Sequence, residues 1–341
     1  MIRAWMKEMD ESMKKRVLGI SGIEVSEIGM GCMGLTHASG EPVSDDEGAK
    51  TIRAAYDAGY TFFDTAECYV GTRPDGTLSH NEDLVGKAFE GMRDEVVIAT
   101  KFGVTHAPDK TLILDSAPDT IRASVDGSLK RLRTDYIDLY YQHRIDSKVE
   151  PEDVAEVMAE LIGAGKVRAW GISEANEEYL RRAHAVCPVS AVQNRFSMMA
   201  RWHESLFPVL EELGVAFVAF SPLGNGFLTG AYSYKTEFEG AQDYRADMPQ
   251  YTEEGQRRAQ PLVDLVRRIA ADHDATEAQV ALAWVLATKP YLIPIPGSRK
   301  VERLRQNARA SELSLTAGEM QAINAELAKS DLLVFGGHKA R

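Results

Sequence analysis

Residues 95–143 contain EVVIATK (95–101), APDTIRASVDGSLKRL (117–132) and YIDLYYQH (136–143) in succession. The two outer runs are short and rich in β-branched and aromatic residues, which is typical of buried strands. The middle segment places apolar residues at helical spacing after a proline that suits a first helical turn. This order predicts one β/α/β unit.

The same alternation continues in both directions along the chain. Further strand-like runs are SEIGMG (26–31), YTFFDT (60–65), VRAWGIS (167–173), VSAVQN (189–194), VAFVAF (215–220) and YLIPIP (291–296). Amphipathic segments lie between them at 46–59, 151–165 and 203–214. Ser44 with Glu47 predicts a capping box, and Gly59, Gly165 and Gly214 stand where helices should end.

Eight such units in about 300 residues predict a closed (β/α)8 TIM barrel. A doubly wound open sheet is the alternative, although it needs fewer strands and usually a second domain. Residues 13–25 are expected to form an N-terminal β-hairpin that plugs the barrel, and 222–255 a long loop after strand seven. Residues 316–330 predict an extra C-terminal helix capped by Thr316. We expect one barrel domain over 13–341, preceded by a flexible leader at 1–12.

Composition limits the classes of function. The formal net charge of -12 disfavours binding to nucleic acid or an anionic membrane. Three scattered cysteines do not suit a disulfide framework or a metal site, so we expect reduced thiols and a cytoplasmic protein. The chain contains no apolar run of the roughly 20 residues that span a bilayer, and its N-terminus does not resemble a signal peptide.

Ionisable residues stand at the ends of three consecutive predicted strands. Asp64 ends the second strand, with Tyr69 five residues later, Lys101 ends the third and His143 the fourth. Barrel enzymes place their chemistry at this end of the strands, so we expect the four side chains to meet. Each alone has an ordinary explanation, a helix cap for Asp64 or a solvated cation for Lys101, but their coincidence favours a site.

The four residue types together suit proton transfer to a carbonyl oxygen. A tyrosine pKa near ~10 is high for this task, and a nearby ammonium is expected to lower it. A carboxylate would hold the lysine charged, while a neutral imidazole would orient the carbonyl. One histidine and one aspartate are too few ligands for a metal site.

The chain resembles the aldo-keto reductase superfamily. The resemblance covers about residues 14–330 through FFDTAECY, IATKFG, IDLYYQH, WGISEAN, AVQN, FSPLG and PIPGSRKVERLRQN, in the family's order. It is similar to the bacterial and plant branch that reduces aldehydes and ketones. The resemblance implies a catalytic tetrad of Asp64, Tyr69, Lys101 and His143, and NADP(H) as cofactor.

The string GMGCMG (29–34) matches the dinucleotide fingerprint, but LTHASGEPVS separates it from the next helix. We therefore interpret its glycines as room for a flat ring beside the backbone. A better phosphate site is PIPGSRKVER (294–303), which follows the last strand and adds Arg299, Lys300 and Arg303 near a helix start. A basic solvated helix face is the alternative. The cluster favours NADPH over NADH.

The resemblance implies further cofactor contacts. It assigns the nicotinamide carboxamide to Ser173 and Gln193, ring stacking to Phe220, the pyrophosphate to Ser221, Leu223 and Gly226, the 2′-phosphate to Gly297, Ser298, Arg299 and Arg303, and the adenine to Gln306 and Asn307. Phe220 stands where the family more often has tyrosine, which preserves stacking and removes a hydroxyl. Cys68 is given no catalytic role, and Arg144 is expected to form a salt bridge within its loop.

The predicted function is reduction of an aldehyde or ketone by NADPH, with Tyr69 as proton donor and a small carbonyl compound as partner. One alternative is a lyase in which Lys101 forms a Schiff base, which requires a depressed lysine pKa. Another is a cofactor-sensing regulatory protein with the same barrel. The sequence does not identify the physiological substrate and does not distinguish a monomer from a homo-oligomer.

Overall fold

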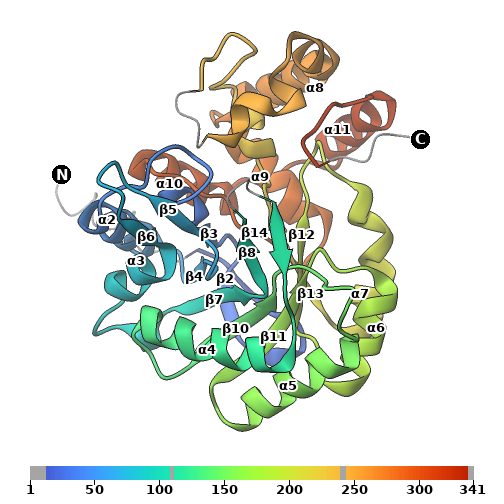
Figure 1. Ribbon diagram of the computed structural model, residues 1–341. Helices are drawn as coiled ribbons and strands as arrows, with labels where there is room; N and C mark the ends of the chain where they lie inside the picture. The colour runs from blue at the N-terminus through green and yellow to red at the C-terminus, as the bar shows by residue number, and fades with distance from the viewer. Residues whose placement is uncertain (1–12, 108–110, 239–242, 337–341) are drawn as a thin grey trace, which may run out of the picture.

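The computed structural model describes residues 13–107, 111–238 and 243–336, and the predicted leader at 1–12 lies outside them. Its centre is a sheet of eight parallel strands (Figure 1). In sheet order these are β3 (Met30–Gly31), β4 (Phe62–Asp64), β7 (Val97–Phe102), β10 (Ile137–Gln142), β11 (Val167–Ser173), β12 (Ala191–Arg195), β13 (Ala216–Phe220) and β14 (Leu292–Pro294). All eight predicted strands are present.

Backbone hydrogen bonds join the first and last strands and close the sheet. Gly29 N donates to Pro294 O at 2.9 Å, and Gly31 N donates to Pro296 O at 3.2 Å. The predicted (β/α)8 barrel is therefore confirmed, and the open doubly wound alternative is wrong. The glycines serve this closure, because a Cβ at Gly31 would lie 2.8 Å from the Ile295 carbonyl oxygen. The ring that approaches Gly29 belongs to Phe62 of the neighbouring strand.

Helices surround the barrel (Figure 1). They are α2 (Asp45–Asp57), α3 (Asn81–Ala88), α4 (Pro118–Leu132), α5 (Pro151–Gly163), α6 (Glu177–Val186), α7 (Phe207–Leu213), α8 (Glu253–Asp272), α9 (Glu277–Thr288), α10 (Val301–Ala308) and α11 (Ala317–Lys329). Ser44 accepts a hydrogen bond from Glu47 N, which is one half of the predicted capping box. Complete capping boxes occur at Thr276 and Thr316, so the extra C-terminal helix is confirmed with its cap.

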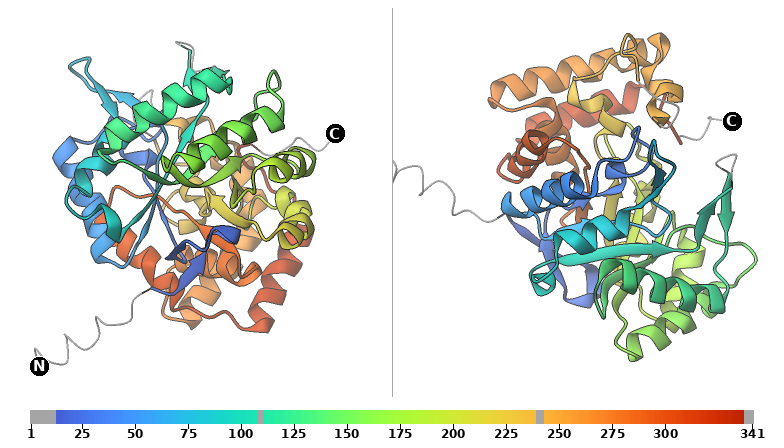
Figure 2. Two further views of the ribbon diagram at one scale, coloured as in Figure 1. Left: turned by 90° about the horizontal axis from the view of Figure 1, so that it is seen from below. Right: turned by 60° about the vertical axis from the view of Figure 1, so that its left-hand side comes forward.

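The N-terminal hairpin closes one end of the barrel, as predicted. Strands β1 (Lys15–Val17) and β2 (Glu24–Ser26) pair in antiparallel fashion. Leu18, Ile23 and Val25 are buried in the same apolar cluster as the side chains inside the barrel. The left view of Figure 2 looks from below, with this hairpin in blue. The plug excludes water from the barrel interior, so the open end is the one where the parallel strands finish.

Two antiparallel ribbons at that open end are absent from the sequence prediction. The first joins β5 (Val70–Thr72) to β6 (Leu78–His80), and the second joins β8 (Val104–His106) to β9 (Leu112–Leu114). The second ribbon stands out from the barrel in the right view of Figure 2.

The segment 222–255 follows β13 as a long loop, as predicted. Its described residues form short 3₁₀ turns at 224–229, 244–247 and 249–251 before α8 begins at Glu253. Helix α8 packs beside α11 at one edge of the barrel (Figure 1). Within the described residues, no helix has the length and apolar character needed to cross a membrane.

Candidate active site

The four predicted ionisable residues meet at the carboxyl end of the barrel. Asp64 is the last residue of β4, Lys101 lies near the end of β7, and His143 follows β10. Tyr69 sits in the turn after β4, where its backbone N donates to Ala66 O at 3.1 Å. All four are buried, from 1 % exposed for Lys101 to 9 % for Tyr69. The barrel thus assembles them from three neighbouring strands.

The Lys101 ammonium is the centre of the group. Its Nζ donates to Asp64 Oδ1 at 2.6 Å and to Thr65 O at 2.8 Å, and it lies 3.3 Å from the Tyr69 hydroxyl. The other carboxylate oxygen, Asp64 Oδ2, accepts from Gln193 Nε2 at 2.7 Å. Both Asp64 carboxylate oxygens and the Lys101 ammonium therefore have hydrogen-bond partners within the protein, as buried charges require.

The environment sets the protonation states. Burial lowers the pKa of Lys101, but Asp64 and Tyr69 outweigh it and the net pKa is raised, so the lysine stays charged. Burial also raises the pKa of Asp64, and Lys101 and Gln193 oppose that rise. Burial, Lys101 and Arg144 hold the pKa of His143 well below its usual range, which keeps the imidazole neutral as expected.

The expected lowering of the Tyr69 pKa is wrong for this structure. Burial raises the pKa of Tyr69 to about 12, and the nearby Lys101 only reduces that rise. The sequence supplies the charged neighbour but not the depth of burial, and here desolvation is the larger effect. Tyr69 therefore carries its proton at neutral pH.

His143 has two contacts that define its orientation. Its ring meets the Tyr69 ring edge-on with centroids 5.7 Å apart. Its Nδ1 atom lies 3.4 Å from the Cys68 sulfur. Sequence reasoning gave Cys68 no role, because its position next to Tyr69 does not reveal that it faces a residue 75 positions away.

Aromatic rings, imidazole rings and apolar side chains surround Tyr69. His37 stacks on the Tyr69 ring at 6.1 Å between centroids and also contacts the rings of His106 and Tyr244. A small apolar cluster combines Ala66, Cys68, Tyr69 and Val104 with the partly buried Met33 and Leu114. His106, Val104 and Leu114 come from the β8–β9 ribbon. The unpredicted ribbon therefore shapes the surroundings of the site.

The residues assigned to the nicotinamide lie on the next strands. Ser173 ends β11 and Gln193 lies on β12; both are buried. Phe220 ends β13, and the Arg195 guanidinium lies 4.9 Å from its ring centroid. Ser221 and Gly226 both have positive φ, 51° and 99°, and Leu223 lies between them. These residues form a continuous rim from Asp64, through the Gln193 hydrogen bond, to the loop after β13.

Arg144 corrects a sequence interpretation. The expected salt bridge is wrong, since within the described residues Arg144 forms no ion pair. Its Nη1 donates instead to His143 O at 2.6 Å and to Ser173 Oγ at 3.1 Å. Arg144 thus connects the backbone of His143 with Ser173, a link that sequence spacing does not reveal.

The residues assigned to the phosphate end lie between β14 and α10. Arg299 Nε donates to Gly34 O at 2.5 Å, and its Nη2 is buried with no hydrogen-bond partner among the described residues. Arg303 Nη1 donates to the Tyr232 hydroxyl at 2.9 Å. Arg245 lies over the same ring, 5.0 Å from its centroid. Three guanidinium groups thus gather here in a chain of net charge -12.

The remaining members of this set differ in exposure. Gly297 is packed against the Gly31 carbonyl oxygen and takes part in barrel closure. Ser298 Oγ accepts from Lys300 N at 3.0 Å. Helix α10 begins only at Val301, so Ser298 precedes the helix instead of lying in its first turn. On α10, Gln306 is exposed and Asn307 is buried.

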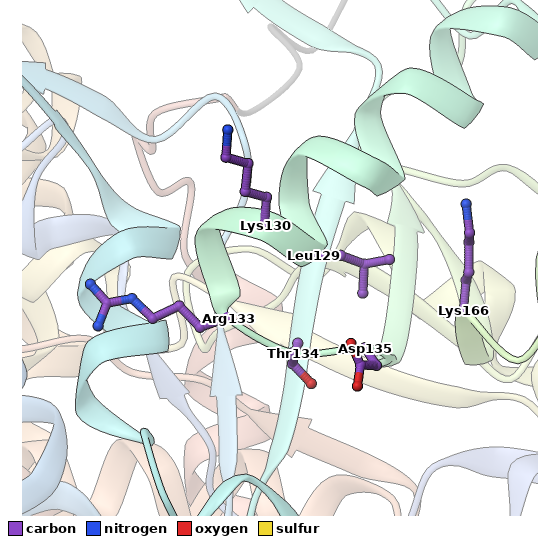
Figure 3. A pocket seen from close by; sticks show the side chains of 6 residues that line it. All are labelled: Leu129, Lys130, Arg133, Thr134, Asp135 and Lys166. Carbon is purple, nitrogen blue, oxygen red and sulfur yellow. The ribbon is translucent and has the colours of Figure 1, made fainter.

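A wide surface depression lies at the other end of the barrel (Figure 3). Its lining consists of Leu129, Lys130, Arg133, Thr134, Asp135 and Lys166. In Figure 3 the Lys130 and Lys166 side chains extend side by side but well apart, and the Arg133 guanidinium points away from both, so the three charges do not converge on one ligand. This depression is separate from the group around Lys101.

Ionisable side chains gathered where the strands of a closed barrel end are the arrangement in which barrel enzymes build their active sites. A family model described as "Aldo/keto reductase family" matches residues 27–328. Two relatives are each 38 % identical: a probable aldo-keto reductase 1 of Glycine max, aligned over 90 % of this chain and 86 % of its own, and the aldo-keto reductase str7 of Strobilurus tenacellus, aligned over 90 % of both. The chain belongs to the aldo/keto reductase family.

The solved structures agree with this assignment. A glycerol dehydrogenase of Gluconobacter oxydans superposes with a TM-score of 0.82 and 27 % identity, over 96 % of this chain and 98 % of that one. The aldo-keto reductase AKR11C1 of Bacillus halodurans superposes with a TM-score of 0.72 and 26 % identity, over 96 % and 99 %. Family and fold together support an oxidoreductase that acts on carbonyl groups with a nicotinamide cofactor.

Proposed function

We propose that this protein reduces an aldehyde or ketone to an alcohol with NADPH, and that Tyr69 is the general acid. One observation carries the proposal: Lys101 Nζ lies between the Asp64 carboxylate and the Tyr69 hydroxyl, at 2.6 and 3.3 Å, in a buried site beside His143. This arrangement suits the delivery of a proton to an oxygen whose negative charge is developing.

The residues around the site fit a phosphate-bearing nicotinamide cofactor. Arg299 has a buried nitrogen that lacks a hydrogen-bond partner among the described residues, and Arg303 and Arg245 both contact one tyrosine ring near it. Guanidinium groups of this kind recognise phosphate, so Arg299 and Arg303, with Gly297 and Ser298, would hold a 2′-phosphate. The bound cofactor supplies the hydride.

The other cofactor contacts follow the order of the elements around the barrel. Gln306 and Asn307 on α10 would meet the adenine, and Ser221, Leu223 and Gly226 the pyrophosphate. Phe220 would stack on the nicotinamide ring. Ser173 and Gln193 would hold its carboxamide; Gln193 donates to Asp64 through Nε2, which leaves its amide oxygen for this contact.

Each residue of the tetrad then has a defined task. Neutral His143 donates a hydrogen bond to the substrate oxygen and orients the carbonyl. Tyr69, whose pKa is raised to about 12, still has its proton and gives it to that oxygen. Lys101 stabilises the phenolate that Tyr69 becomes, and Asp64 keeps Lys101 in place. The ring-lined surroundings of Tyr69 exclude water from this transfer.

Steady-state kinetics with 4-nitrobenzaldehyde and NADPH tests the proposal. We expect NADPH consumption by the wild type. Tyr69→Phe should lose about 10²- to 10⁴-fold in kcat/KM, the usual range for a general acid, and keep its affinity for NADPH. A wild type that neither binds NADPH nor consumes it with simple aldehydes would overturn the function. Loss of binding together with turnover in Tyr69→Phe would overturn the role of Tyr69.

The Schiff-base alternative is disfavoured by the same geometry. A nucleophilic lysine needs a depressed pKa, whereas Asp64 and Tyr69 raise the pKa of Lys101. Borohydride trapping of a carbonyl compound on Lys101 would support the lyase. We expect no trapped adduct.

A further inference from the structure

The contact between Cys68 and His143 has a fixed geometry. Cys68 Sγ lies 3.4 Å from His143 Nδ1, and each residue is only 7 % exposed. Two backbone hydrogen bonds hold the turn that carries Cys68: Tyr69 N donates to Ala66 O, and Val70 N donates to Cys68 O at 2.8 Å. The backbone that carries the Cys68 side chain is therefore held by the same turn that positions Tyr69.

The protonation states indicate which atom donates. Burial raises the pKa of Cys68 to about 12, so the sulfur carries a proton. The imidazole is neutral, because burial and the charge of Lys101 and Arg144, with His106 and His37 nearby, oppose its protonation. A thiol is a weak donor and its sulfur a weak acceptor, whereas an unprotonated imidazole nitrogen accepts well. The favoured bond is S–H to Nδ1.

This bond has a consequence at the other ring nitrogen. A neutral histidine carries one proton, and the partner of one nitrogen decides which nitrogen has it. With Nδ1 as acceptor, the proton is on Nε2. The described residues contain no hydrogen-bond partner for Nε2, so it is available to a substrate oxygen. The opposite tautomer would place a lone pair against that oxygen and repel it.

We propose that Cys68 is a positioning residue, whose thiol donates to His143 Nδ1 and holds the imidazole in the tautomer that carries its proton on Nε2. The importance of this for catalysis rests on the proposed carbonyl reduction. The tautomer itself does not depend on that function, because it follows from a contact within the protein.

The first test measures the tautomer directly. In protein labelled with ¹⁵N-histidine, long-range ¹H–¹⁵N correlation distinguishes a protonated, pyrrole-type nitrogen from an unprotonated, imine-type one. The His143 signals are assigned by their absence in His143→Gln. We expect an imine-type Nδ1 in the wild type and in Cys68→Ser, which keeps a donor, and a mixture of tautomers in Cys68→Ala. A pyrrole-type Nδ1 in the wild type, or an unchanged tautomer in Cys68→Ala, would overturn the proposal.

The second test measures the effect on turnover. Cys68→Ala should lower kcat/KM about threefold to tenfold, the scale of one lost hydrogen bond, with the Kd for NADPH unchanged. Cys68→Ser should stay within about twofold of the wild type by the same reasoning. Cys187→Ala, at the far end of α6, is the matched control and should change neither quantity. A mixed tautomer with unchanged kcat/KM in Cys68→Ala would remove the positioning role.

The two proposals fail in different ways. If the wild type reduces no carbonyl compound while Nδ1 is imine-type, the proposed function fails and the Cys68–His143 assignment stands. If reduction proceeds and the alanine variant keeps both the tautomer and the rate, the assignment fails and the function stands.

Discussion

Asp64→Asn removes one charge from the buried pair at the centre of the site and keeps the shape of the side chain. The Lys101 and Asp64 side chains are 1 % and 4 % exposed, and their charged atoms are 2.6 Å apart. Removing one partner of such a pair costs about 3–5 kcal/mol, because the other charge stays buried without compensation. Asparagine keeps an acceptor oxygen, and Thr65 O still accepts from Lys101, so we expect about 3 kcal/mol less unfolding free energy.

A double-mutant cycle separates this cost from catalysis. Lys101→Met leaves the Asp64 carboxylate with Gln193 as its remaining partner, and should also destabilise. Asp64→Asn combined with Lys101→Met removes both charges and should recover most of the lost stability, to within about 1 kcal/mol of the wild type. The double variant should remain inactive, because Tyr69 then has no ammonium beside it.

The control is an ion pair of the same length on the surface. Lys166 Nζ and Asp126 Oδ1 are also 2.6 Å apart, but their side chains are 40 % and 63 % exposed. Asp126→Asn should cost less than about 1 kcal/mol, as exposed pairs do. Urea unfolding monitored by circular dichroism measures all four variants against the wild type. If Asp64→Asn lowers the unfolding free energy no more than Asp126→Asn does, burial does not make the Lys101–Asp64 pair costly to break.

Three further predictions concern the cofactor, the imidazole and the barrel closure. Arg303→Ala should weaken NADPH binding about 10- to 100-fold and leave NADH binding unchanged, measured by fluorescence titration; equal losses would contradict a 2′-phosphate contact. The pKa of His143 is depressed on folding, so below about pH 6.5 the unfolded state binds this proton more readily than the folded state. The unfolding free energy should therefore fall as the pH drops below that value. His143→Gln should therefore flatten the acid side of the unfolding profile, and an unchanged slope would argue against a buried neutral imidazole. Gly31→Ala should destabilise the barrel by about 1–3 kcal/mol, since its Cβ would meet the Ile295 carbonyl oxygen at 2.8 Å. A melting temperature equal to that of the wild type would show that the backbone around Ile295 shifts to accept the Cβ at little cost.

The barrel was predictable because its strands are buried on both faces. Such strands appear as continuous apolar runs, as β7 and β10 do, and each run ends close to where the sequence indicates. The β5–β6 and β8–β9 ribbons gave no such pattern, because each of their strands has three residues and is partly exposed. Only the turn RPDGT (73–77) carried a usable signal for the first ribbon.

The sequence predicted which residues form the site, but it did not predict the hydrogen bonds among their side chains. Asp64, Lys101 and His143 could be found because strand ends of a barrel share one face. The bonds from Cys68 to His143 and from Arg144 to Ser173 depend on side-chain directions in turns, which residue spacing does not specify. The pKa of Tyr69 depends on its burial, which the sequence does not specify either.

The two carboxylate oxygens of Asp64 bind different partners, and this connects the proposed cofactor site with the proposed proton donor. Oδ1 binds Lys101 and Oδ2 binds Gln193, so one carboxylate connects the tetrad on β4 and β7 with the proposed carboxamide site on β12. On the other side, Arg144 joins the His143 backbone to Ser173, the second residue proposed for the carboxamide. A cofactor held by Ser173 and Gln193 would therefore rest on the same hydrogen bonds that orient Lys101 and His143. Binding at the rim and proton delivery at Tyr69 would then be coupled through two short connections, one buried at Asp64 and one partly buried at Arg144.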